Sequence, residues 1–550
     1  MSSTILARHL GETLHLNRRG PILWPALRAF LSVLVPLALL LQLGRVDLVG
    51  GAVFGALTSV YCRSEPYRNQ IRALVAVATG MVLAVGIGDL IAVAGLEPRQ
   101  QHLAAVLGTA VVGALATAAT TAAKLGAPGG LIFSFATGAC ANTTLEPAEV
   151  PAHLVACSIS GAFAWGLCAL GAAWAGLRPQ RRAVAAALEA TAAHLANRTD
   201  LMTRHRAAVA IETAWTRLPL VGRRKHETAE YGELIQAIEI CEVLLGSGRV
   251  ASETVRSLRS TAERIRAGGT PHPPGYARSE TPLAPPLPPS RWRAVRGVLL
   301  AAVRPRRASG NWLLPFALRV GSAALLAGVL AELLGLGHTY WAAVSAVSVL
   351  QATSTSRSVP RMLQRVAGTL GGVLIGLALL SEHPPVWALL LLLAVLQWAA
   401  EATVTINYAF GLLFATPVAL LVSGLMSSAP PEQLVASRLW ATLLGAAVAV
   451  LVARLAPHGA WLARVHESLR LVGELTELRG VVPPDRLRAS LIELHDAYET
   501  AAGEVPDTLL PTEELLAVSR RAYRLLDSRD YPAPAPPGWG RAAGTPGESG

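Results

Sequence analysis

Twelve apolar runs constrain the fold of this chain more than any other feature of its sequence. They form two sets of six, and between Arg178 and Arg307 no run of comparable length occurs. A helix needs about 20 apolar residues to cross the hydrocarbon core of a bilayer. Only 15% of the 550 residues are charged, against about 25% in an ordinary soluble domain. The sequence therefore predicts an all-α polytopic membrane protein. The runs cover residues 23–43, 48–61, 73–95, 103–123, 129–143, 153–176, 312–335, 339–352, 366–381, 385–400, 406–425 and 435–456.

The distribution of positive charge predicts how the chain is oriented. Residues 1–20 contain three arginines and one glutamate, and residues 177–310 contain 22 basic and 11 acidic side chains. Short cytoplasmic segments of membrane proteins carry such an excess of Arg and Lys. We therefore expect a multi-pass protein of the plasma membrane with both termini and both soluble stretches in the cytoplasm. Residues 1–20 also lack the apolar region and cleavage site of a signal peptide, so the first run is expected to remain as a span.

Three motifs recur in the same order in both sets of runs, which predicts an internal repeat. Since each set has an even number of spans, the two repeats are expected to be parallel and related by a pseudo-two-fold axis along the membrane normal. The second span is short in both halves, which indicates either a transporter site, or a tilted neighbour that thins the bilayer, or spans that extend beyond the apolar runs. The paired motifs are Ala26-Leu27-Arg28 with Ala317-Leu318-Arg319, Arg63-Ser64-Glu65-Pro66 with Arg357-Ser358-Val359-Pro360, and Phe135-Ala136-Thr137 with Phe414-Ala415-Thr416.

The second half also carries the motif of a known family. The residues are His338-Thr339-Tyr340-Trp341-Ala342, followed by Arg361, Arg365, Gly368-Thr369 and Gly371-Gly372. This pattern resembles the fusaric acid resistance (FUSC) family, whose bacterial members are inner-membrane proteins similar to aromatic acid exporters. The resemblance implies six spans and a cytoplasmic helical region, given twice, in a transporter-like protein. It implies no particular substrate.

The soluble stretches separate the chain into seven expected segments. Helical spacing of apolar residues predicts helices after each set of spans, and we expect the two helical regions to pack on each other. Closely spaced prolines predict a spacer before the second set. The segments are a cytoplasmic N-terminus (1–20), a first six-helix repeat (21–176), a helical region (177–268), a Pro-rich linker (269–311), a second repeat (312–456), a helical region (457–530) and a disordered tail (531–550).

Six repeated arginines are the first candidates for substrate binding. Arg28 and Arg319 lie about one turn inside the first span of each half, and the other four form two pairs with i,i+4 spacing. Such pairs share one face of a helix, so the six are predicted to line a basic vestibule at the cytoplasmic mouth. A guanidinium group suits both a carboxylate and an aromatic ring. The alternative is that all six obey the positive-inside rule and reach lipid headgroups. The pairs are Arg68 with Arg72 and Arg361 with Arg365.

A few other polar or aromatic residues fall within or beside the spans. Trp341 is a substrate-path candidate, although tryptophans at span ends more commonly anchor a protein at the interface. Asn407 and Tyr408 are candidates for hydrogen bonds to substrate or between helices. Asp89 and Glu332 are proton-coupling candidates towards the outer face, because ionisable residues within spans are commonly functional. Exposure at a helix end is the competing interpretation, preferred for Glu332.

The remaining sequence features favour neither an enzyme nor a cofactor. There is no phosphate-binding loop, and the five cysteines form no CxxC pair, so neither zinc nor disulfides are indicated. The histidines show no ligand spacing, and His153 is placed at an outer helix end. Aromatic residues are not interleaved with the basic ones, so nucleic acid is not an expected partner. The expected partners are a small organic anion and the lipid bilayer, with a possible homo-oligomer.

Three functional hypotheses follow. The first is proton-driven export of small organic acids, and the resemblance alone points to aromatic acids. The second is a passive anion channel with the same architecture. The third is a membrane scaffold whose cytoplasmic helices recruit partners.

Overall fold

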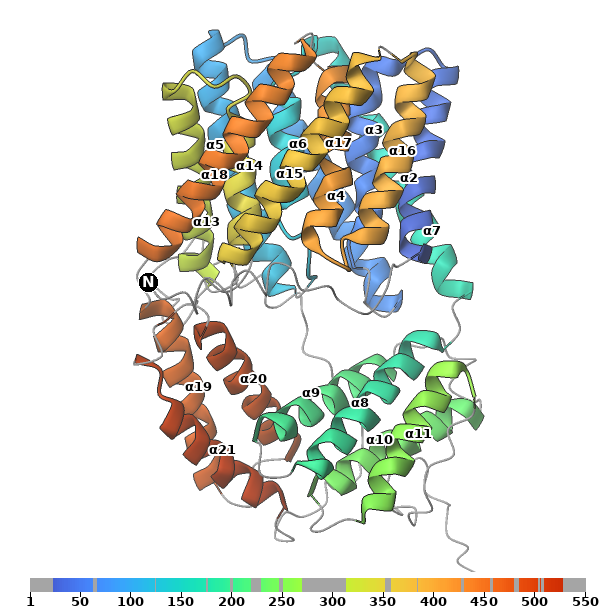
Figure 1. Ribbon diagram of the computed structural model, residues 1–550, viewed down its shortest axis with the longest axis vertical. Coiled ribbons are helices and arrows are strands. Elements are labelled where there is room, and N and C mark those ends of the chain that lie inside the picture. Colours follow the sequence, from blue (N-terminus) through green and yellow to red (C-terminus); the bar gives the residue numbers. More distant parts are fainter. Residues whose placement is uncertain are drawn as a thin grey trace, which may run out of the picture. The chain divides into compact units, whose positions relative to one another are not determined.

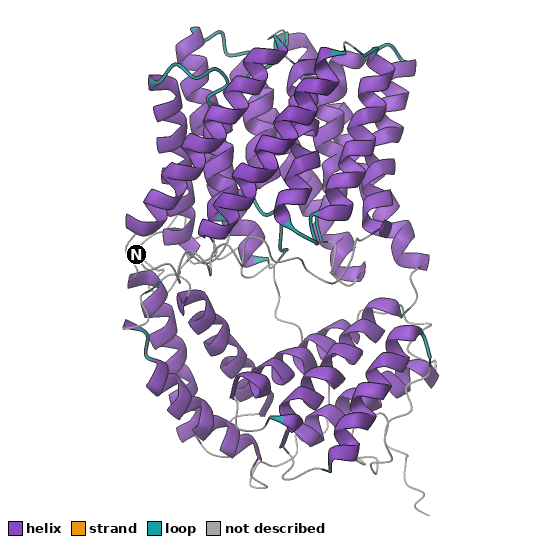
Figure 2. Ribbon diagram, in the orientation of Figure 1, coloured by secondary structure: helices purple, strands orange, loops and turns teal. Residues whose placement is uncertain are grey.

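The computed structural model is built of helices throughout the residues that it describes (Figures 1 and 2). It divides into two compact units. We call residues 1–176, 290–464 and 499–509 the membrane unit, and residues 177–289, 465–498 and 510–550 the helical unit. The described residues are 23–62, 67–123, 125–174, 177–197, 201–218, 229–246, 251–269, 313–351, 358–382, 384–426, 430–455, 459–478, 484–502, 505 and 509–527. The expected N-terminal segment 1–20, the tail 531–550 and all but Gly269 of the expected linker 269–311 lie outside them.

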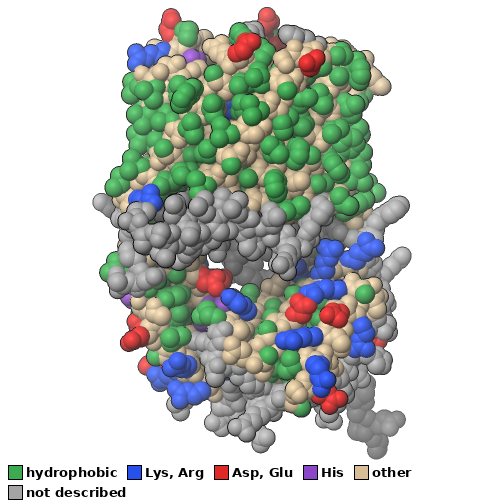
Figure 3. Space-filling model, in the orientation of Figure 1, with side chains coloured by type: hydrophobic (Ala, Val, Ile, Leu, Met, Phe, Trp, Pro, Cys, Tyr) green, Lys and Arg blue, Asp and Glu red, His purple; other side chains and the backbone are tan. Residues whose placement is uncertain are grey.

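The membrane unit contains nine described helices that are long and apolar enough to cross a bilayer, which confirms a multi-pass, all-helical protein. Its surface is largely hydrophobic on the face that Figure 3 shows, as contact with lipid requires. In chain order the first part comprises α2 (Leu23–Gln42), η1 (Val46–Leu48), α3 (Val49–Ala56), η2 (Leu57–Val60), α4 (Tyr67–Ala92), α5 (Pro98–Ala122), α6 (Leu131–Cys140), η3 (Pro147–Glu149) and α7 (Val150–Trp174). The second part comprises α13 (Leu313–Leu333), α14 (Tyr340–Leu350), α15 (Ser358–Ser381), α16 (Val386–Thr403), α17 (Tyr408–Met426) and α18 (Pro431–Leu455).

Three shorter apolar helical segments lie inside the membrane unit: Val46–Val60, Leu131–Cys140 and Tyr340–Leu350. The two expected short second spans are therefore confirmed as short. Every residue of α3 and of α14 is buried by the neighbouring helices. At about 1.5 Å per residue, the 11 residues of α14 extend over only about 16 Å. A helix this short begins or ends well below the membrane surface.

The same kinds of neighbours recur in the two parts of the membrane unit. In the first part α3 packs on α7 and α4 packs on α6, and in the second part α14 packs on α18 and α15 packs on α17. The first long helix of each part packs on the other part, α2 on α16 and α13 on α5. Residues from both parts therefore meet in one core.

Gly445 allows α14 and α18 to approach each other closely. A Cβ atom at this position would lie 2.3 Å from the carbonyl oxygen of Ala342 and 2.8 Å from Cβ of Ser345. Both distances are too short for non-bonded atoms, so only glycine permits this packing. The close approach brings the middle of α18 directly against α14.

The described residues of the helical unit form seven helices, one of which, α19, begins in the membrane unit. Its core includes the fully buried side chains of Leu188, Ile211, Ile238, Leu258 and Ile265. The helices are α8 (Arg178–Ala196), α9 (Leu201–Arg217), α10 (Ala229–Gly246), α11 (Ser252–Ala267), α19 (Gly459–Glu477), α20 (Pro484–Ala502) and α21 (Thr512–Asp527).

Side chains from the two helical stretches of the sequence meet inside this unit, which confirms the expected packing of one on the other. Arg488 donates a hydrogen bond to the carboxylate of Glu242 over 2.7 Å. The rings of His205 and His495 stack with centroids 4.1 Å apart, and the guanidinium group of Arg204 lies over the ring of Tyr523.

Replacing Glu242 with glutamine should destabilise this contact. The Glu242 carboxylate is nearly buried and also accepts a hydrogen bond from Nε1 of Trp215. Neutralising it removes the charge from this hydrogen bond, and losing such a charge-assisted bond costs about 1 to 3 kcal/mol. Faster hydrogen exchange in α10 and α20 of the full-length variant would show this. Unchanged exchange in both helices would mean that the pair contributes nothing.

Candidate arginine and aromatic site

Two buried arginines approach the middle of the membrane unit from opposite ends. We call these ends the Gly95 end, where α4 is followed by α5, and the Arg72 end, where α4 begins. Arg438 is the eighth residue of α18, which starts at the Gly95 end, and Arg365 is the eighth residue of α15, which starts at the Arg72 end. Each therefore lies about 10 Å along its helix from the starting end.

Arg438 packs against an aromatic ring. Its guanidinium carbon lies 3.6 Å from the centroid of the Trp341 ring, close enough for a cation–π interaction. The side chain is only 4% exposed. Within the described part of the chain, its Nε and Nη1 atoms have no hydrogen-bond partner. Two of its donors are therefore buried and available.

Arg365 of α15 contacts α14 at Ser345, one turn after Trp341, and is held by hydroxyl groups. Its Nη2 donates to Oγ of Ser345 over 3.2 Å, and its Nη1 donates to the hydroxyl oxygen of Tyr408 over 3.4 Å. The side chain is 1% exposed, and its Nε atom has no hydrogen-bond partner among the described residues. The two hydroxyl groups orient the guanidinium group without neutralising it.

Aromatic rings from three helices stack beside the arginines. Trp341 stacks on Tyr340 with centroids 4.7 Å apart and on Phe135 of α6 with centroids 4.8 Å apart. Phe135 in turn meets the edge of Phe54 of α3. The hydroxyl group of Tyr340 is hydrogen-bonded to Ser423 of α17. The stack fixes the Trp341 ring, so the surface that Arg438 covers is rigid.

Together these residues place two buried positive charges beside stacked aromatic rings. Among the described residues neither guanidinium group forms an ion pair, and the buried carboxylate of Glu401 pairs with neither of them. A buried cation without a counter-charge costs several kcal/mol. A bound carboxylate would offset that cost through charge-assisted hydrogen bonds, while its ring could pack on the aromatic stack.

The structure separates the sequence-predicted arginines. Of the four whose side chains are described, only Arg365 lies in this site. Nη2 of Arg28 donates to the carbonyl oxygen of Ser59 at the end of η2, where helix carbonyls lack internal partners. Arg319 packs on the rings of Phe316 and Trp461. Arg72 is exposed. The side chains of Arg68 and Arg361 lie outside the described residues, so the predicted vestibule stays a prediction.

The other candidates give mixed outcomes. Tyr408 and Trp341 lie in the site. The preferred role of Trp341 as an interfacial anchor is wrong, because its ring, at the start of the short helix α14, is fully buried. Oδ1 of Asn407 accepts a hydrogen bond from the backbone N–H of Ala409 at the start of α17. Arg438 was missed, although an arginine inside an apolar run is itself a signal.

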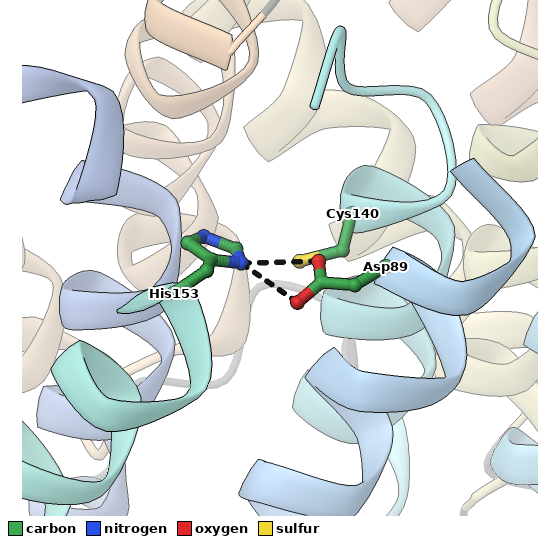
Figure 4. A group of neighbouring side chains, drawn as sticks. All are labelled: Asp89, Cys140 and His153. Carbon is green, nitrogen blue, oxygen red and sulfur yellow. Dashed lines mark hydrogen bonds and ion pairs between the residues drawn. The ribbon is translucent and has the colours of Figure 1, made fainter. Parts of the chain in front are cut away.

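Asp89 belongs to a second buried cluster, drawn in Figure 4. Nδ1 of His153 lies 2.9 and 3.0 Å from the two carboxylate oxygens of Asp89. Sγ of Cys140 lies within 4.8 Å of the other two donor atoms. The three residues come from α4, α7 and α6. Their closeness could not be seen in the sequence, because 64 residues separate Asp89 from His153.

This cluster overturns the placement of His153 at an outer helix end, and it contradicts the competing interpretation of Asp89 as an exposed residue. Asp89 is 0% exposed and His153 is 2% exposed, so neither side chain meets water at a helix end. The preferred exposure of Glu332 is also wrong. Its side chain is partly buried, and its carboxylate lies 3.2 Å from Nδ1 of His102 of α5.

Known proteins resemble this chain in sequence. Residues 326–452, which contain Trp341, Arg365, Tyr408 and Arg438, match the model of the family described as fusaric acid resistance protein-like. The family resemblance is confirmed. An uncharacterized membrane protein of Bacillus subtilis (strain 168), YvaC, is 25% identical over 543 residues, which cover 90% of this chain and 83% of that protein. No solved structure matches the chain significantly.

Proposed function

We propose that this protein transports small aromatic carboxylate anions across the plasma membrane and exports them at the expense of the proton gradient. One observation carries the proposal. The buried guanidinium groups of Arg438 and Arg365 have unused donors beside a fixed aromatic stack. An arginine binds a carboxylate through two parallel hydrogen bonds, and aromatic rings bind the remainder of such a molecule.

The architecture proposed for this transporter is a pair of parallel six-helix repeats. The recurring neighbours described above support it, because they pair α4 with α15 and α7 with α18 as equivalent helices. The proposed orientation, with both termini and the helical unit in the cytoplasm, places the Gly95 end outside. The lipid bilayer is a proposed partner of the membrane unit, and a homo-oligomer is compatible with the proposal.

The proposal treats the protein as a transporter and not as an enzyme. The family description is the reason for favouring transport. Asp89 is the group proposed to couple transport to protons, since it is a buried carboxylate within a membrane-spanning helix.

Uptake of three matched compounds into proteoliposomes tests the proposed substrate class. Benzoate carries both a ring and a negative charge, benzamide lacks the charge, and cyclohexanecarboxylate lacks the π system. We expect saturable exchange of benzoate, weaker exchange of cyclohexanecarboxylate and none of benzamide. Equal transport of all three, or of none, would contradict the proposal.

The same vesicles separate the alternatives. A passive channel would conduct benzoate at a rate that does not respond to a pH gradient at constant membrane potential. A scaffold would not transport benzoate at all, and removal of residues 200–267 would then abolish its cellular function. Proton-driven export instead requires that an imposed pH gradient accumulates benzoate.

A further inference from the structure

The cluster of Asp89, His153 and Cys140 fixes the protonation state of its histidine. Nε2 of His153 lies within hydrogen-bond distance of the backbone N–H of Gly51 in α3. A backbone N–H can only donate, so Nε2 must be the acceptor and carries a lone pair. The ring proton is therefore on Nδ1, where it is donated to the carboxylate of Asp89. His153 is a neutral imidazole between a donor and an acceptor.

Gly51 cannot move away from His153 without disturbing the helix packing. A Cβ atom at Gly51 would lie 2.5 Å from the carbonyl oxygen of His153 and 2.9 Å from its Cδ2. The backbones of α3 and α7 are thus in direct contact at this point. The hydrogen bond from Gly51 is built into that contact.

This tautomer argues against a metal ion. A carboxylate, a thiolate and an imidazole are ligands that zinc accepts, and the three donor atoms lie close together. A metal on Nδ1 would force the ring proton onto Nε2. The Nε2–H group of His153 would then face the backbone N–H of Gly51, and neither could accept a hydrogen bond. The cluster therefore suits a proton better than a metal ion.

The same argument identifies which member binds an additional proton. A second proton on His153 would have to enter at Nε2 and would break the bond from Gly51. The carboxylate oxygens of Asp89 have spare lone pairs and meet no such obstacle. The other titratable groups around the cluster are the buried thiols of Cys140 and Cys157, the hydroxyl of Tyr340, and Asp47, which is already paired with Arg45.

A polar recess leads towards this cluster from the Gly95 end. Its lining includes Ala92, three residues after Asp89 on α4, and Asn142, two residues after Cys140. Gln101, His102, Thr143 and Thr144 complete its polar wall. Water in the recess would come within about one helical turn of the buried carboxylate.

We propose that Asp89 binds the coupled proton from the Gly95 end, and that His153 is a positioning residue held as a neutral Nδ1–H tautomer by Gly51. This inference rests on the proposed transport function. It assigns His153 a role that does not require the imidazole to change its own protonation state.

Three substitutions test this assignment in proteoliposomes. In the Asp89→Asn variant, the response of benzoate transport to an imposed pH gradient should fall at least tenfold. His153→Asn keeps an N–H near the position of Nδ1, and His153→Gln keeps an acceptor near the position of Nε2 but loses the donor to Asp89. We expect the pH midpoint of gradient-driven transport to stay within about 0.3 units in His153→Asn. It should move to higher pH in His153→Gln, because the Asp89 carboxylate loses its donor.

Three results would overturn the assignment. In the first, Asp89→Asn keeps its pH-gradient response. In the second, both His153 variants lose theirs completely. In the third, one equivalent of Zn²⁺ alone binds to the purified wild-type protein and is lost in Cys140→Ala. The two His153 variants test the role of His153 as a positioning residue even if Asp89→Asn fails to fold. Failure of the transport proposal is seen separately, as absence of benzoate exchange by the wild-type protein.

Discussion

Arg438→Gln should lower the affinity of the purified protein for benzoate by roughly 30- to 150-fold. The glutamine removes a buried positive charge and its paired donors, and such a loss costs about 2 to 3 kcal/mol of binding free energy. The substitution also relieves the unpaired buried cation, so the variant should be at least as stable as the wild type when no anion is bound. Equilibrium binding of radiolabelled benzoate measures the first effect, and thermal unfolding in detergent measures the second.

Arg454→Gln is the matched control, because Arg454 lies on the same helix but is exposed. Its affinity for benzoate should remain within twofold of the wild-type value. Equal losses in both variants would indicate a general effect of charge on α18 and not a binding site. Full affinity in Arg438→Gln would exclude Arg438 from the site.

Acidification should weaken the helical unit through His205. Burial, and then the charge of neighbouring His495, lower the pKa of His205 to about 3, from 6.5 for a free histidine. Between these two pH values the unfolded chain binds more protons than the folded one, so stability falls as the pH falls below 6.5. From pH 7.5 to pH 5 the loss amounts to about 2 kcal/mol. The side chain of His205 is only 4% exposed, so solvent does little to reduce the effect.

Hydrogen exchange in α9 and α20 of the full-length protein, corrected for the intrinsic effect of pH, measures this loss. His205→Phe keeps a ring to stack on His495 and should remove most of the pH dependence. His466→Gln, at an exposed position of α19, should leave it unchanged. A helical unit equally protected at pH 5 and pH 7.5 would contradict the burial of a neutral His205.

Hydropathy was sufficient to find the helices of the membrane unit because lipid imposes a simple rule of length and composition. The short helix α14 was visible as a short run between polar residues. The burial of this helix could not be predicted, because the depth of a segment in the membrane depends on how neighbouring helices enclose it. Trp341 was therefore placed at the interface, although α14 carries it into the core.

The polar clusters were harder to predict because their members come from different helices. Asp89 was selected because it is a carboxylate in an apolar run, and the same rule applied to Arg438 would have found it. The partnership of Asp89 with His153 depends on the backbone contact between α3 and α7 at Gly51. No spacing in one sequence reports such a contact. The repeated arginines were predicted to act together because their motifs are similar. Similar motifs have different surroundings, however, since Arg72 is exposed and Arg365 is buried.

The two polar clusters are divided between the two parts of the membrane unit. Asp89 and His153 lie on α4 and α7, whereas Arg365 and Arg438 lie on α15 and α18, the helices inferred to correspond to them. Under the proposed transport function, the proton-binding group therefore belongs to the first part and the anion-binding cations belong to the second, so the two parts are not interchangeable. A chain with the second part in both places would bury Arg365 and Arg438 twice and would contain no Asp89, which leaves sites for anions without the group proposed to couple them to protons.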